Sequence, residues 1–148
     1  MKDPYKDYEK NCGRIRQENA VLLDDFVALL RGQGLATGTI RKHRENAEFF
    51  INEFLLYQET KKPEEGIDDI DEFLGDWFIR KALWSTPRHI KATATSIYKF
   101  YRFLAAADKI TLAELAKLKG TIALHLAEWQ ARCQRYNNLD IDDWRGIG

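Results

Sequence analysis

Three histidines and two cysteines are the side chains of this 148-residue chain best suited to bind a metal or to act as a base or nucleophile. His43, His89 and His125 lie far apart, and none has a cysteine, a second histidine or a carboxylate at the spacing of a metal site. Cys12 and Cys133 have no neighbouring base and do not make a disulfide framework. The pattern therefore predicts no enzyme, no metal and no cofactor.

Two other patterns have structural explanations. Residues 32–38 are rich in glycine, but they follow a predicted helix and lack the lysine of a phosphate-binding loop. The acidic residues between positions 64 and 76 coincide with a predicted helix start, where negative charge favours the helix dipole.

The charge of the segment 84–107 is arranged differently, because it contains no acidic residue. On a helix, five of its polar positions fall within a wedge of about 80° and extend over about 21 Å. The stripe consists of Arg88, Lys91, Thr95, Lys99 and Arg102. A straight basic stripe of this kind suits a phosphate backbone.

A second basic group begins the second predicted helix, where Arg41, Lys42 and Arg44 stand in the first turns. Backbone N–H groups and the dipole favour an anion at such an end. Both basic groups can also be explained as ordinary solvent-exposed helix faces. The chain has 23 basic and 23 acidic residues, so its net charge gives no overall attraction to nucleic acid. The two groups form one surface only if their helices pack side by side.

Five helices are predicted from apolar residues at helical spacing, and no alternation of period two indicates a strand. The first covers about 14–31 and ends at the glycines that follow. The second covers about 39–57, capped by Thr37, and the third about 69–83, with a capping box at Asp69 and Glu72.

The fourth helix begins at Thr86 and Pro87 and runs to about residue 107. Thr111 and Glu114 form a capping box for the fifth, which Gly120 is expected to interrupt. The sequence thus predicts an all-α domain over 14–136, with an N-terminal extension over 1–13 and a C-terminal tail over 137–148.

The last helix carries an apolar stripe that has two possible uses. It consists of Ile122, Leu126, Trp129, Cys133 and Tyr136. The stripe either closes the core, which we favour, or binds a second copy of the chain or a partner protein. A polar start and the lack of an apolar run of about 20 residues predict a cytoplasmic protein without a membrane segment.

Three segments of the chain resemble those of a known family. They are residues 34–40 with Ala47 and Phe50, residues 67–74, and residues 97–104. Together, over about 20–107, the chain resembles the core-binding domain of tyrosine recombinases of the phage integrase type. The resemblance implies a SAM-like four-helix bundle, to which this chain adds a C-terminal helix. Two positions depart from the pattern, with Ala36 in place of a common capping serine and His43 in place of a common tyrosine.

In that family the second and fourth helices face duplex DNA, and these are the two helices that carry the basic groups here. The resemblance implies one groove contact at Thr39, Arg41, Lys42 and Arg44, and the next at Arg88, Lys91, Thr95 and Lys99. The catalytic residues of the family are not in this chain. We therefore expect a non-catalytic DNA-binding module of a mobile element, with a role in DNA integration or recombination, or alternatively a protein–protein interaction module of the same fold. The sequence is compatible both with a stand-alone protein and with a fragment of a recombinase.

Overall fold

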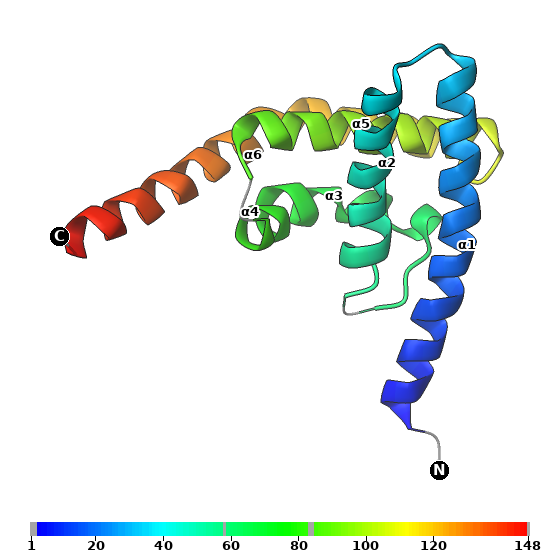
Figure 1. Cartoon of the computed structure of the whole chain (residues 1–148), viewed down its shortest axis with the longest axis horizontal. Helices are drawn as coiled ribbons and strands as arrows, with labels where there is room; N and C mark the ends of the chain where they lie inside the picture. The colour runs from blue at the N-terminus through cyan, green and yellow to red at the C-terminus, as the bar shows by residue number, and fades with distance from the viewer. Residues whose placement is uncertain (1–2, 58, 83–84, 148) are drawn as a thin grey trace.

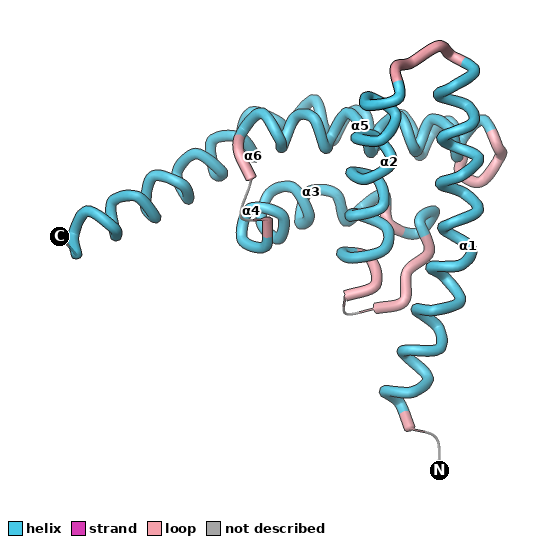
Figure 2. The backbone as a smooth tube through the Cα atoms, viewed as in Figure 1, coloured by secondary structure: helices cyan, strands magenta, loops and turns pink. Residues whose placement is uncertain are grey.

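The computed structural model describes residues 3–57, 59–82 and 85–147, and the side chains as far as residue 139. Within these ranges all regular structure is helical, which confirms the predicted all-α class (Figures 1 and 2). The elements are α1 (Pro4–Gly32), α2 (Thr37–Glu48), η1 (Phe49–Phe54), η2 (Pro63–Glu65), η3 (Ile67–Asp69), α3 (Ile70–Glu72), η4 (Phe73–Trp77), α4 (Phe78–Lys81), α5 (Pro87–Ala106) and α6 (Leu112–Ile147).

Helix α1 begins ten residues earlier than predicted, so the N-terminal extension expected over 1–13 is wrong. Asp3 caps the helix by accepting a hydrogen bond from the backbone N–H of Tyr5 at 3.0 Å, and Pro4 occupies the first turn. Cys12 and Ile15 are buried against Leu56 in a small second cluster, which gives the early turns a tertiary contact. The helix ends at the predicted glycines, and Gly34 has a φ of 80°, which favours glycine.

The second predicted helix divides into α2 and a wider π-helical segment, η1. Thr37 is the first helical residue rather than the cap, since Ala36 takes the cap position without a side-chain hydrogen bond. In η1 the consecutive residues Phe49 and Phe50 both pack against Phe73, with ring centroids 6.0 and 5.0 Å away. Phe73 itself begins η4, a second π-helical segment, and a π turn holds more residues than an α turn. The two wide segments thus meet in one aromatic cluster.

The third predicted helix corresponds to the consecutive elements α3, η4 and α4. The expected capping box at Asp69 is wrong, because Asp69 makes no cap and its carboxylate instead accepts a hydrogen bond from Lys61 Nζ at 2.9 Å. Helical turns begin already at Pro63, within the expected connection. The predicted end at residue 83 lies outside the described residues.

Helix α5 lies at the centre of the fold and contacts α1, α2 and α6. Its predicted start is confirmed, because the Thr86 hydroxyl accepts a hydrogen bond from the His89 backbone N–H at 3.1 Å. Its apolar side is buried, and the hydroxyl of the fully buried Tyr101 donates to the Pro63 carbonyl at 2.5 Å. This bond attaches the turns before α3 to the central helix.

Helix α6 begins at the predicted capping box, in which Thr111 and Glu114 each accept the other's backbone N–H. One prediction is wrong, however, because Gly120 does not interrupt the helix, which continues through the segment expected as a C-terminal tail to Ile147. The helix runs along α5 and then continues beyond the rest of the molecule (Figure 1).

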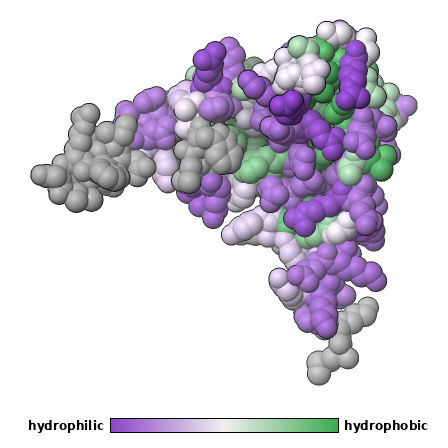
Figure 3. All heavy atoms as spheres, viewed as in Figure 1, coloured by the Kyte–Doolittle hydropathy of each residue, from purple (hydrophilic) through white to green (hydrophobic). Residues whose placement is uncertain are grey.

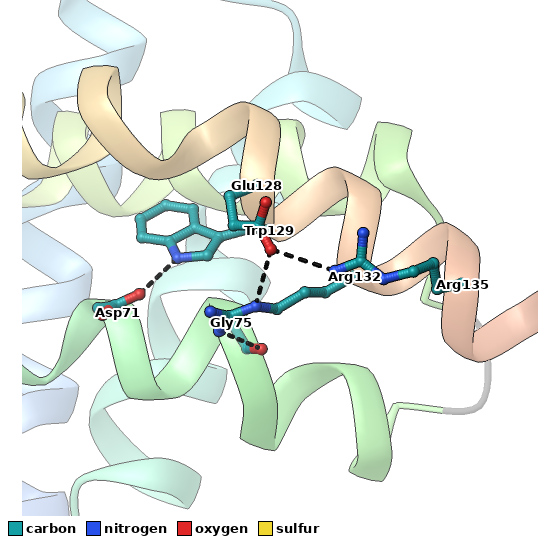
Figure 4. A network of polar contacts seen from close by, with 6 residues as sticks. All are labelled: Asp71, Gly75, Glu128, Trp129, Arg132 and Arg135. Atoms are coloured by element: carbon teal, nitrogen blue, oxygen red, sulfur yellow. Dashed lines mark hydrogen bonds and ion pairs between the residues drawn. The ribbon is translucent and has the colours of Figure 1, made fainter.

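The apolar stripe of α6 packs into the main core, as favoured. Trp129 and Cys133 are buried, Ile122 and Leu126 pack against the same cluster, and only Tyr136 is exposed. Trp129 is fixed further by its indole N–H, which donates to Asp71 Oδ1 at 2.6 Å (Figure 4). Beside it, Arg132 Nη1 donates to the Gly75 carbonyl at 3.4 Å, and Arg132 and Arg135 both bind Glu128.

The outer surface in Figure 3 is largely hydrophilic, with apolar side chains reaching it in patches between the elements. Among the described residues, none of the helices is both long enough and apolar enough to cross a membrane.

We expect Gly75→Ala to destabilise the fold by about 1 to 3 kcal/mol. A Cβ there would lie 2.9 Å from Trp129 Cδ1 and 3.1 Å from its Nε1, and the bond to Asp71 prevents the indole from moving away. Urea denaturation followed by circular dichroism measures the effect. Gly120→Ala is the control, because the added methyl meets nothing within 4 Å and should stabilise α6 by up to about 1 kcal/mol. Equal stability of Gly75→Ala and the parent chain would contradict the packing described.

Candidate nucleic-acid interface

Helices α2 and α5, which carry the two predicted basic groups, pack against each other and cross steeply (Figure 1). A polar contact joins them at the crossing. Ser96 Oγ of α5 lies 2.8 Å from His43 Nδ1 and 3.0 Å from Asn46 Nδ2, both on α2. The condition under which the two basic groups could form one surface is therefore met.

The hydrogen bonds of Ser96 determine which nitrogen of His43 carries a proton. Two acceptors lie within reach of the Ser96 hydroxyl, and we assign its single hydrogen to the Ala92 carbonyl at 3.1 Å, which can only accept, rather than to His43 Nδ1 at 2.8 Å. Its lone pairs then accept from Asn46 and from His43 Nδ1. With this assignment His43 is protonated at Nδ1, which leaves Nε2 as a bare acceptor in the neutral ring.

Partial burial lowers the pKa of His43, and the positive charge of Lys99 lowers it further. His43 is consequently neutral at physiological pH. The effect of Lys99 also shows that this cation of α5 lies near the α2 side chain.

The basic residues of α2 are divided between two sides of the helix. Arg44 is half-buried and binds Asp24 of α1, with 3.1 Å between Nη1 and Oδ1, so it faces α1 rather than α5. Arg41 precedes Arg44 by three residues, which is about 60° around the helix, and lies on the same side. Lys42 precedes Asn46 by four residues, about 40° around the helix, and lies on the side of α5.

Thr39 precedes His43 by four residues and shares that side with Lys42. The structure thus brings Thr39 and Lys42 toward α5 and directs Arg41 and Arg44 away from it. Of the expected set on this helix, Arg44 is already engaged by an acidic partner.

The stripe on α5 remains accessible. Arg88, Lys91, Thr95 and Arg102 are exposed and Lys99 is half-buried. The Thr95 hydroxyl donates to the Lys91 carbonyl at 3.0 Å and keeps its lone pairs for other donors. Ser96 faces α2, and Lys99 stands about 60° further around the helix, so the stripe borders the crossing.

The cations around the crossing have no acidic partner among the residues that the structure describes. This holds for Arg41, Lys42, Arg88, Lys91, Lys99 and Arg102. Most other ion pairs lie elsewhere, on the elements between residues 59 and 81 and on α6. An exposed acidic residue of α2, Glu45, is the nearest opposing charge in sequence, three positions after Lys42.

Helix α6 does not cover the stripe. It contacts the start of α5, where Gln130 Nε2 donates to the Pro87 carbonyl at 3.0 Å and Asn137 Nδ2 donates to the Ser85 carbonyl at 3.1 Å. Arg88, Lys91 and Arg102 stay exposed, and Lys99 is half-buried.

A hollow of about 280 Å³ lies on another part of the molecule, between η1 and α4, and is lined by Phe54, Tyr57 and Trp77. Its charged groups are mostly engaged with each other or with their neighbours. Lys61 binds Asp69 at 2.9 Å, and Arg80 binds both carboxylate oxygens of Asp76 at 3.0 and 2.9 Å. It is therefore a weaker candidate for a charged ligand than the crossing.

The described part of the chain provides no evidence for a metal site or a reactive thiol. No three His, Cys, Asp or Glu side chains gather there as a metal site. Cys12 and Cys133 are buried as free thiols in separate clusters.

The sequence interpretation missed the contact of His43, Asn46 and Ser96. The positions are separated by 50 or more residues, and no local pattern marks them as partners. The departure at His43 from the family pattern was the one available signal.

Comparison with known protein families, characterised proteins and solved structures finds no match to this chain.

We expect Ser96→Ala to destabilise the fold by about 1 to 2 kcal/mol, because it leaves the donors of His43 and Asn46 without their acceptor at a buried position. Thermal and urea denaturation measure the loss. The adjacent exposed change, Thr95→Ala, removes a hydroxyl of similar size and should stay within about 0.5 kcal/mol of the parent. If both variants were equally stable, the polar contact would not hold α2 to α5.

Proposed function

We propose that this chain is a non-catalytic DNA-binding module that contacts the phosphates of duplex DNA at the crossing of α2 and α5. The observation that carries the proposal is a group of five cations without acidic partners that border a single crossing. The group consists of Lys42, Arg88, Lys91, Lys99 and Arg102. We call this group the crossing cations.

Their arrangement suits a phosphate backbone better than a small anion. The stripe on α5 spans about 21 Å, whereas phosphates on one strand follow each other at about 3.4 Å of helix axis. The hydroxyls of Thr39 and Thr95 add neutral groups that often bind phosphate oxygens. The balanced net charge does not oppose this role, because the crossing cations gather like charge around one part of the surface.

The resemblance to the core-binding domain of phage integrases supports the same proposal, since it names the same two helices. A role in the recombination of a mobile element follows from that resemblance alone. The alternative function is the binding of a partner protein by the apolar stripe of α6. Little of that stripe is accessible to a partner, because four of its five side chains pack in or against the core.

We expect the chain to bind long duplex DNA with an affinity that falls steeply with salt. If each of the crossing cations neutralises one phosphate, the slope of log K against log salt is about −4.5. Fluorescence anisotropy with a labelled duplex at several salt concentrations measures it.

The pair of changes Lys91→Glu and Lys99→Glu should weaken this binding by about 100-fold or more, because two attractive contacts become repulsive. Lys6→Glu with Lys10→Glu is the matched control, with the same change in net charge on exposed positions in the first turns of α1. The start of α1 lies at the end of the molecule away from the crossing (Figure 1). It should change the affinity by no more than about threefold, because salt screens distant charges. Absence of binding to duplex DNA at low salt, or equal loss in both pairs, would contradict the proposal.

A further inference from the structure

His43 stands at the crossing with one ring nitrogen engaged and the other available. Nδ1 is held by Ser96, which is only 1% exposed, so this edge of the ring faces the interior. Nε2 makes no hydrogen bond to a described residue and is not among the buried polar atoms that lack a partner. The ring is partly exposed, and Nε2 is therefore the nitrogen that a ligand can reach.

Protonation of His43 changes only this free nitrogen. In the neutral ring Nδ1 already carries the proton that Ser96 accepts, so the added proton goes to Nε2. The contact between α2 and α5 is the same in both forms. Nε2 then changes from an acceptor, whose lone pair repels a phosphate oxygen, into a charged donor that can bind one.

The charges around His43 disfavour its protonation in the free protein. From α5 the nearest is Lys99, and His89 lies seven residues before Ser96 with its Nδ1 3.0 Å from the Thr86 hydroxyl. From α1, the Asp24 carboxylate reaches α2 but binds Arg44, the residue after His43.

On α2 itself, Lys42 directly precedes His43 and adds positive charge, while Glu45 follows His43 by two residues and adds negative charge. Glu53 of η1 lies ten residues on, about 15 Å along the axis. None of these carboxylates makes a hydrogen bond or ion pair with the His43 ring, and a phosphate would supply the negative charge that is missing.

We propose that His43 is a phosphate ligand at the α2–α5 crossing that donates from Nε2 only in its protonated form, so that binding of duplex DNA takes up a proton. This inference rests on the proposed function and names a binding residue that the basic pattern alone did not indicate.

The direction of the pH dependence follows from linkage. The pKa of His43 is lowered in the free protein by partial burial and by Lys99, and a bound phosphate raises it. Affinity for DNA is therefore highest below the pKa of the free protein and is lost as the pH rises through the pKa of the complex. A difference of about one pKa unit corresponds to about a tenfold change in affinity.

Two measurements test the inference. The NMR resonances of the His43 ring, followed against pH with and without excess duplex DNA, should show a higher pKa in the complex. Anisotropy at constant salt should show affinity that is about tenfold stronger at about pH 5.5 than at about pH 8, on the two sides of the ordinary histidine pKa.

The variant His43→Gln should bind DNA with little dependence on pH over this range, while the matched control His89→Gln should keep the dependence of the parent chain. DNA binding with an unchanged or lowered His43 pKa would overturn this inference and leave the proposed function standing. No binding of the parent chain at low salt and about pH 5.5 would overturn both. Since the NMR titration uses the parent chain, it decides the matter even if His43→Gln does not fold.

Discussion

The contact between α2 and α5 through Ser96 is the constraint on which the rest of the surface depends. A buried hydroxyl that serves one carbonyl and two side-chain donors is fully satisfied only in one register of the two helices. A slide or rotation of α2 by one residue would leave the donors of His43 and Asn46 without their shared acceptor. Apolar packing around the crossing supplies the attraction, and this polar contact fixes where the basic side chains come to lie.

Charge in this chain is balanced in total but unequal in distribution. The segments that pack against α6 carry most of the ion pairs, such as Lys117 with Asp68 and Arg80 with Asp76. Exposed pairs of this kind add little stability, yet they neutralise each other locally. The crossing cations make none of these ion pairs with described residues and share one part of the surface, which a count of charged residues cannot reveal.

The sequence predicted the helical class, the α5 start and the α6 capping box because these depend on local signals. Thr86 followed by Pro87, and Thr111 followed by Glu114, form their hydrogen bonds within one turn. The wrong boundaries have tertiary causes. Asp69 has the spacing of a cap, but Lys61 holds its carboxylate, and residues after 136 continue the helix that Trp129 anchors.

The candidate surface was predicted only in part for the same reason. The basic stripe of α5 was predictable from the spacing of its residues, since positions on one helix are related by a fixed rotation. It could not show that Arg44 would meet Asp24 on α1, or that His43 would meet Ser96 across 53 positions. Such contacts depend on which helices become neighbours.

The two π-helical segments have a consequence for the tolerance of this chain to changes in length. Because η1 holds an extra residue in its wide turn, Phe49 and Phe50 can face the same ring, and Leu55 and Leu56 in the turn that follows are buried. A shortened homologue that returned this segment to an ordinary α turn would rotate one of these rings toward water by about 100°. Evolutionary insertions and deletions should therefore avoid η1 and η4, where residue number is set by the aromatic cluster, and accumulate in the connections at either end.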